Sequence, residues 1–233
     1  MKSRRGLGIA AALIITSFMG TSAWAAPCSN IAPVLGGSNV AAFTALGATG
    51  CEVDGFNFSS IVVNFLTSGG GTVTLGNIVP FQSIVNGVLE SGLTLNYIAN
   101  AGVAGAEADV QLQYNVTGVG GTLITDAFMS VAGNTTGNGQ AQISEILTNG
   151  VTLSLNAPGS TTASFAPIAS LGALKDQADH ANTGTASSSA LTNAFSSVSS
   201  VPGPIVGAGL PGLVVACGGL LALARRHHRR RVT

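Results

Sequence analysis

Alternation of apolar and polar residues constrains the fold of this chain more than any other sequence feature. Within residues 109–116, Val110, Leu112, Tyr114 and Val116 occupy every second position, and polar residues fill the positions between them. Successive side chains of a β-strand point to opposite faces, so this pattern gives one apolar and one polar face. Such strands are typical of antiparallel sheets that have one face in the core and one in water.

Similar segments recur along most of the chain, with Gly-, Asn- and Pro-containing turns between them. The further strands that we expect lie at residues 56–67, 72–75, 93–97, 122–131, 140–148, 151–156, 164–174 and 184–197. The dipeptide Asn149-Gly150 predicts a two-residue hairpin turn, because both residues tolerate positive φ. A short helix is expected over 40–46, with Gly47 and Gly50 at its end. The whole pattern predicts an all-β fold, an antiparallel β-sandwich of jelly-roll-like type.

The first 25 residues have the features of a secretory signal peptide. A basic start at residues 2–5 precedes an apolar core at 7–19, and small residues form an A-x-A cleavage site at 23–25. We therefore predict an exported protein and exclude residues 1–25 from the fold. The Arg4-Arg5 pair leaves the twin-arginine route open beside the general secretory route.

The carboxy-terminal segment predicts a single transmembrane helix. Residues 205–224 are apolar and carry no charge. At roughly 1.5 Å rise per residue they make about 30 Å of helix, which is the thickness of the hydrocarbon core of a bilayer. The basic tail at 225–231 contains Arg225, Arg226, Arg229, Arg230 and Arg231. Arginines beside a span resist translocation, so this tail is expected to stay on the cytoplasmic side.

The motif Val201-Pro202-Gly203-Pro204 stands directly before the apolar span. The order of proline motif, span and basic tail over 201–233 resembles the PEP-CTERM sorting signal of exported bacterial proteins. That resemblance implies an exosortase-type membrane protease as partner, a precursor anchored in the inner membrane, and a final location at the cell surface or outside the cell. The usual motif has Glu at the position of Gly203, and the alternative is an ordinary C-terminal anchor that is never processed.

Two stretches of the exported part are also similar to PEP-CTERM proteins. They are the opening from Cys28 through the run 50–59 and the late stretch 165–176. The resemblance implies an exported β-rich protein of undefined biochemical activity.

The exported part divides into a domain and a connection. Residues 26–182 are expected to form the β-sandwich domain. Residues 183–200 are mostly Gly, Ala, Ser and Thr and are expected to form an edge strand that runs into a flexible stalk. Cys28 and Cys51 are expected to pair in an oxidising compartment, closing a loop that contributes about 3 kcal/mol. A free buried pair of thiols is the alternative.

The exported part is strongly acidic. All 9 Asp and Glu residues lie between the targeting segments, and Lys175 is the one Lys or Arg there. Such a surface has no electrostatic footprint for nucleic acid. It would also need divalent ions to hold an anionic membrane or an anionic polysaccharide.

Few residues of the exported part carry catalytic chemistry. His180 is its one histidine, in a polar stretch that we interpret as a solvated loop. The acid pairs Glu52/Asp54 and Glu107/Asp109 stand at i and i+2, which puts both carboxylates on one side of a strand. Such pairs serve glycoside hydrolysis or bind Ca²⁺, but the exported part has no Trp and only two Tyr to line a sugar cleft. We therefore predict no enzyme activity, no catalytic residues, no cofactor and no metal site.

Two functional hypotheses remain. The first is a structural or interaction protein of the envelope or of a biofilm matrix, which contacts exopolysaccharide or further copies of itself. The second is a β-sandwich carbohydrate-binding module, with or without Ca²⁺, on a plain C-terminal membrane anchor. The scarcity of Trp and Tyr favours the first, because sugar-binding platforms generally stack on aromatic rings.

Overall fold

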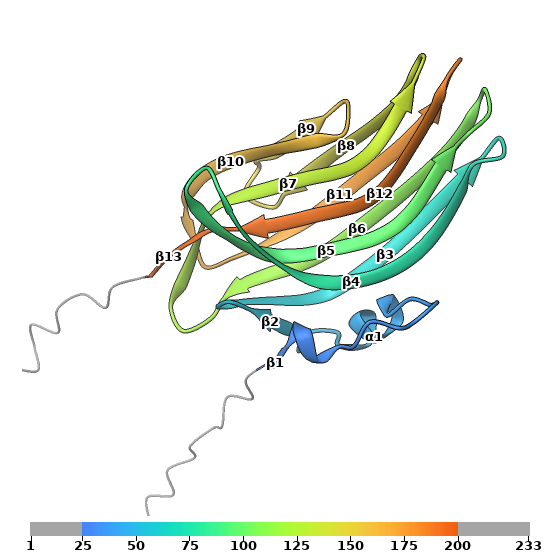
Figure 1. Ribbon diagram of the computed structural model, residues 1–233. Helices are drawn as coiled ribbons and strands as arrows, with labels where there is room; N and C mark the ends of the chain where they lie inside the picture. The colour runs from blue at the N-terminus through green and yellow to red at the C-terminus, as the bar shows by residue number, and fades with distance from the viewer. Residues whose placement is uncertain (1–24, 200–233) are drawn as a thin grey trace, which may run out of the picture.

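Two β-sheets lie face to face in the computed structural model, which describes residues 25–199 (Figure 1). The seven-stranded sheet has the order β1 (Ala26–Pro27), β2 (Cys51–Val53), β3 (Phe56–Ser68), β6 (Ala106–Gly118), β11 (Ser170–Ala181), β8 (Gly139–Leu147) and β9 (Thr152–Leu155). The six-stranded sheet has the order β10 (Gly159–Ile168), β7 (Thr122–Thr136), β12 (Thr185–Phe195), β5 (Val88–Ala101) and β4 (Thr72–Val85), with β13 (Ser197–Ser199) also paired to β7. The all-β, two-sheet sandwich is therefore as predicted.

The alternation in β6 decides which of its side chains enter the core. Its four alternating apolar side chains are buried between the sheets, whereas Gln113 among them faces solvent. Phe58 of β3 packs against Tyr114 with ring centroids 5.7 Å apart. Phe195 of β12 closes this cluster from the opposite sheet, 6.2 Å from Phe58. Large buried aromatic side chains dominate the energetics of a core, so this cluster holds the two sheets together.

Asn-Gly turns set the register of two hairpins. β8 and β9 form the predicted hairpin, with Gly150 at a φ of 87°. The Leu147 N–H donates to the Val151 carbonyl at 2.9 Å, so Thr148 joins the loop and the turn is longer than predicted. Asn86-Gly87 connects β4 to β5 with φ of 52° and 84°, the positive values that a type I′ turn requires.

A disulfide ties the amino-terminal segment to the seven-stranded sheet. Cys28, in the 3-10 helix η1 (Cys28–Asn30), is bonded to Cys51 of β2, and both residues are fully buried. The predicted pair is confirmed.

The short predicted helix is also present, as α1 (Val40–Ala45), below the β3 and β4 edge in Figure 1. The Phe43 side chain of this helix is fully buried. Just before it, the Asn39 side chain accepts a hydrogen bond from the Ile78 N–H at 2.7 Å and donates to the Ile78 carbonyl at 2.9 Å. Because β4 is the last strand of its sheet, these bonds cover part of an otherwise open edge.

The strand predicted at 184–197 is present, but the prediction that it is an edge strand running into a flexible stalk is wrong. β12 lies in the interior of the six-stranded sheet, paired with β5 on one side and with β7 on the other. Ala186 stands opposite Ala101, and Ala194 stands opposite Gly92. Small residues thus face small residues across the ladder, and such a strand has the composition of a linker although it is buried.

The strand predicted over 164–174 is divided between the two sheets. β10 ends at Ile168 and β11 begins at Ser170, so the chain crosses from one sheet to the other at Ala169. β11 then continues through the polar stretch that contains His180. The interpretation of that stretch as a solvated loop is therefore also wrong.

The predicted targeting segments fall outside the described residues. They comprise residues 1–24 of the predicted signal peptide, the motif 201–204, the predicted span 205–224 and the basic tail 225–231. Within residues 25–199, no helix has the length and apolar character that a membrane crossing needs.

Candidate functional site

The outward side chains of β3, β6, β11 and β8 form a surface that we call the outer polar face. The strand register places Asn64, Gln111, Asp176 and Ser144 in one row across these four strands. Gln111 Nε2 donates to Asp176 Oδ1 at 3.3 Å in the middle of that row. Amide, carboxyl and hydroxyl groups from segments far apart in the sequence thus meet on one surface.

Two hollows lie on the outer polar face, one on each side of the Gln111–Asp176 bond. The first has a volume of about 210 Å³, and its lining includes Gln113, Asn115, Ile146, Thr148, Gly172 and Leu174. The second has a volume of about 190 Å³ and is lined by Leu66, Thr67, Ser68, Glu107, Asp109, Ala178 and His180. Gly172 helps to keep the first hollow open, because a Cβ there would lie 3.0 Å from Thr148 Cγ2.

The second hollow contains a cluster of carboxyl groups. Burial, followed by the charge and hydrogen bond of Asp176 and by the charge of Glu107, raises the pKa of Asp109 to about 7. One Asp109 oxygen is buried without a hydrogen-bond partner. Glu107 accepts from Ser68 Oγ at 3.1 Å and lies 2.8 Å from His180 Nδ1. The prediction that Glu107 and Asp109 share one side of a strand is confirmed, and near neutral pH Asp109 can donate as well as accept a hydrogen bond.

The other acid pair is not arranged as predicted. Glu52 lies on β2, but Asp54 lies in the turn after that strand, at a φ of 46°, and accepts a hydrogen bond from Ser91 Oγ at 2.9 Å. The Asp54-Gly55 turn ends the strand before the second carboxylate. In the part of the chain that the structure describes, no three His, Cys, Asp or Glu side chains are grouped to hold a metal ion.

The raised pKa of Asp109 predicts a pH dependence of stability. An acid whose pKa rises from 3.8 to about 7 on folding binds more protons in the folded state between these values. Its contribution to the free energy of unfolding is therefore most favourable at low pH and is lost as the pH rises toward and through about 7. We measure the melting temperatures of Asp109→Asn and of the unaltered protein by thermal unfolding. The melting temperature of Asp109→Asn minus that of the unaltered protein should increase as the pH is raised over this interval. Glu52→Gln, on β2 of the same sheet, is the control, and an Asp109→Asn profile parallel to that of the unaltered protein would contradict the prediction.

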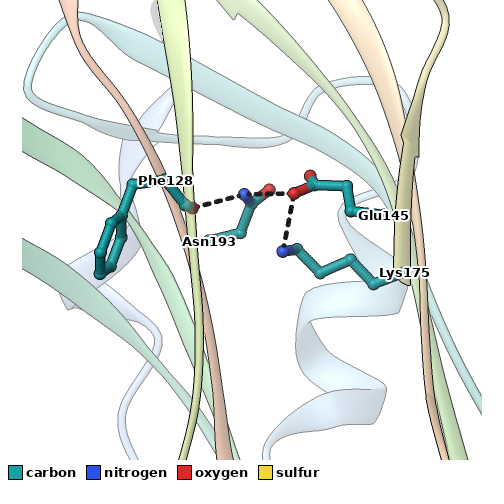
Figure 2. A network of polar contacts seen from close by, with 4 residues as sticks. All are labelled: Phe128, Glu145, Lys175 and Asn193. Carbon is teal, nitrogen blue, oxygen red and sulfur yellow. Dashed lines mark hydrogen bonds and ion pairs between the residues drawn. The ribbon is translucent and has the colours of Figure 1, made fainter. Parts of the chain in front are cut away.

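A second polar group lies inside the sandwich (Figure 2). Lys175 Nζ of β11 and Glu145 Oε2 of β8 are 3.0 Å apart, and both side chains are fully buried. Asn193 of β12 reaches in from the opposite sheet. Its Nδ2 donates to Glu145 Oε2 at 3.3 Å and to the Phe128 carbonyl oxygen at 2.9 Å. Burial lowers the pKa of Lys175 from its usual value, and the charge and hydrogen bond of Glu145 oppose that shift.

The interior network continues along β11. Gln177 Nε2 donates to Asp179 Oδ1 at 2.9 Å, and Ser188 Oγ donates to Asp179 Oδ2 at 2.7 Å. Tyr97 Oη donates to Gln177 Oε1 at 3.1 Å. Burial raises the pKa of Asp179, and the hydrogen bonds from Ser188 and Gln177 partly offset the rise. The spacing of Lys175, Gln177 and Asp179 could have shown that they share a face, but their polarity would assign that face to water.

These features define an all-β, disulfide-bonded sandwich domain with a polar outer face and a charged interior. No family model matches the chain, and no curated protein matches it. Among solved structures, it is similar to the enzymatically active domain of tailspike protein 4 of bacteriophage CBA120, with 14% identity, a TM-score of 0.28, and coverage of 58% of this chain and 19% of that chain. It is also similar to TmCBM61 in complex with β-1,4-galactotriose, with 8% identity, a TM-score of 0.28, and coverage of 56% and 86%. A family two carbohydrate esterase from Cellvibrio japonicus has 10% identity, a TM-score of 0.22, and coverage of 60% and 36%.

The chain spans only 19% of the length of the tailspike domain and 36% of that of the esterase. At TM-scores this low, none of the three likenesses carries an argument about function.

Proposed function

We propose that this chain is a non-enzymatic, exported surface or matrix protein whose jelly-roll-like sandwich contacts a neutral, hydroxyl-rich polysaccharide through the outer polar face. The observation that carries the proposal is the pair of hollows on that face, set among amides, carboxyls and hydroxyls. Sugar hydroxyls both donate and accept hydrogen bonds, and this mixture of groups matches them. The exposed aliphatic side chains of Leu66, Ile146 and Leu174 line the hollows and offer contacts to the C–H faces of sugar rings.

The charge of the domain supports a neutral polymer as the partner. Lys175 is the one Lys or Arg within residues 25–199, and it is buried in the ion pair with Glu145. The described surface therefore presents carboxylates without an ammonium or guanidinium group. A polyanion would be repelled by such a surface, whereas a neutral polysaccharide would not.

Binding at a single site is expected to be weak. Tyr97 and Tyr114 are both buried, so neither ring is available to stack on a sugar. A weak contact is useful where many copies meet a repeating polymer, because multivalency raises the overall affinity without a new contact. Weak contacts of many copies are typical of a matrix component, which agrees with the structural role that the sequence favours over a carbohydrate-binding module.

The amide of Gln113 is expected to contribute to polysaccharide binding. Gln113→Ala removes an exposed amide from the first hollow and should weaken retention in an affinity gel of a neutral galactan or glucan about two-fold or more, since one hydrogen bond contributes roughly 0.5–1.5 kcal/mol. The matched control is Asn100→Ala, an exposed strand amide on the six-stranded sheet. Equal retention of both variants, or no retention of the unaltered protein on any neutral polysaccharide, would remove the proposed function.

We further propose that the segment 201–233 sorts the protein through an exosortase-type system from an inner-membrane precursor to the cell surface. The resemblance of the proline motif, apolar span and basic tail to the PEP-CTERM signal supports this route. Intact masses from strains with and without a functional exosortase test it. A product that ends near Pro204 only when the exosortase is present agrees with sorting. A product that keeps the arginine tail in both strains would make the protein a domain on a plain membrane anchor that is never processed.

A further inference from the structure

We propose that Lys175 and Asn193 join in an intramolecular amide bond between their side chains, with Glu145 as the proton-transfer group. The bond would link β11 of the seven-stranded sheet to β12 of the six-stranded sheet. It is independent of polysaccharide binding, because all three side chains lie inside the sandwich and none lines a hollow of the outer polar face.

The geometry brings an amine, a carboxamide and a carboxyl group to one point. Glu145 Oε2 accepts from Lys175 Nζ at 3.0 Å and from Asn193 Nδ2 at 3.3 Å, so the nucleophile and the leaving group share one acceptor atom. Figure 2 shows the Asn193 amide between the Phe128 carbonyl and the Glu145 carboxylate, with the Lys175 amine close by. A second hydrogen bond of the same amide, from Asn193 Nδ2 to the Phe128 carbonyl oxygen at 2.9 Å, fixes the amide plane. Reacting groups held in this way gain the rate advantage of an intramolecular reaction.

The surroundings of the three groups exclude water. All three side chains are fully buried. In the strand register Lys175 stands opposite Leu112, and Asn193 stands opposite Leu93 and Met129, which are themselves buried. Glu145 Oε1 and Asn193 Oδ1 are buried without hydrogen-bond partners. These two atoms are the ones that a proton on Glu145 would bridge during attack on the amide.

Burial also prepares the amine for reaction. A low-dielectric site disfavours the ammonium form, and burial lowers the pKa of Lys175 accordingly. Transfer of the Lys175 proton to Glu145 gives a neutral amine with a free lone pair and a neutral carboxylic acid. Desolvated lysines of this kind are effective nucleophiles.

The reaction balances without an external reagent. The Lys175 Nζ lone pair attacks Asn193 Cγ, while the protonated Glu145 donates to Oδ1 and stabilises the developing oxyanion. Glu145 then takes a proton from Nζ and passes it to Nδ2. The Cγ–Nδ2 bond breaks and ammonia leaves, while the Oδ1 proton returns to Glu145, so that the new Nζ–Cγ amide and the neutral Glu145 carboxylic acid remain. No atom is oxidised or reduced, and the chain becomes lighter by one ammonia, about 17 Da.

The intact mass of the purified, denatured and reduced full chain tests the proposal directly. We expect a mass about 17 Da below that of the processed sequence, because one ammonia is lost. Glu145→Gln, Lys175→Met and Asn193→Ala should each restore the full mass. Asp179→Asn is the matched control: it alters the neighbouring buried network but leaves the three reacting groups in place, and it should keep the lower mass.

Trypsin provides a second readout that separates this bond from other losses of ammonia. Between Arg5 and Arg225 the chain has no Lys or Arg except Lys175, so trypsin can cut the denatured domain only there. An acylated Lys175 blocks that cut, and the domain should remain in one piece. Succinimide formation at Asn86-Gly87 or Asn149-Gly150 also releases ammonia, but it leaves Lys175 open to trypsin. A full-mass chain that trypsin divides at Lys175 would overturn the proposal and leave a noncovalent ion pair.

Discussion

Lys175→Met is expected to lower the free energy of unfolding by about 3–5 kcal/mol, the loss that follows when one partner of a buried ion pair is removed. The Glu145 carboxylate would then remain inside the sandwich with the Asn193 amide as its remaining hydrogen-bond donor among the described side chains. A buried charge without its partner carries its full desolvation cost. Chemical denaturation of the variant and the unaltered protein measures the difference.

The double variant Lys175→Met/Glu145→Leu separates the cost of the unpaired charge from the cost of altered packing at the site. Replacement of a whole buried pair by apolar residues of similar size is often neutral, so the double variant should recover the part of the loss that comes from the unpaired carboxylate. A Lys175→Met variant as stable as the unaltered protein would show that the ion pair contributes nothing to the fold. The expected loss is that of the noncovalent pair; where the mass shows the proposed Lys175–Asn193 bond, Lys175→Met removes that cross-link as well.

Removal of the Cys28–Cys51 disulfide is expected to cost about 3 kcal/mol, because the bond constrains the unfolded chain. The two cysteines are 23 positions apart in the sequence. In a domain of this size such a loss lowers the melting temperature by roughly 6–12 °C. The double variant Cys28→Ala/Cys51→Ala and the unaltered protein in a thiol reductant should therefore melt at nearly the same lower temperature.

The position of the disulfide indicates which part of the fold loosens first. Between the two cysteines lie α1 and Asn39, whose side chain covers the β4 edge at Ile78. Hydrogen exchange should accordingly rise first at Ile78 when the bond is absent. A reductant that leaves the melting temperature unchanged would contradict the expected contribution of the disulfide.

Local patterns predicted the strands wherever an apolar residue alternates with a polar one. The run 109–116 became β6 with its apolar side chains in the core, and Glu107 and Asp109 followed the same period onto the outer polar face. Asn149-Gly150 predicted a hairpin because its backbone preference is local. Asn86-Gly87 carried an equally clear signal, and it joins the long hairpin of β4 and β5.

Local patterns failed where burial did not coincide with hydrophobicity. β12 was predicted as a strand, but its many small and polar residues suggested a position at the sheet edge, whereas it lies between β5 and β7. The polar residues of β11 suggested a solvated loop, although Lys175 and Asp179 face the core. Both errors have one cause: partners from distant strands satisfy these groups, and the pairing of distant strands is not encoded in any short window.

The strand period, the turns and the candidate cysteine pair could be predicted from the amino-acid sequence, because each depends on neighbouring residues or on residue type. The tertiary structure alone decided that Lys175, Glu145 and Asn193 meet between the sheets, and that residues of four strands line up on the outer polar face. Strand order and register set these encounters. They result from the packing of the whole domain, in which a buried charge is tolerated only where another part of the chain supplies its partner.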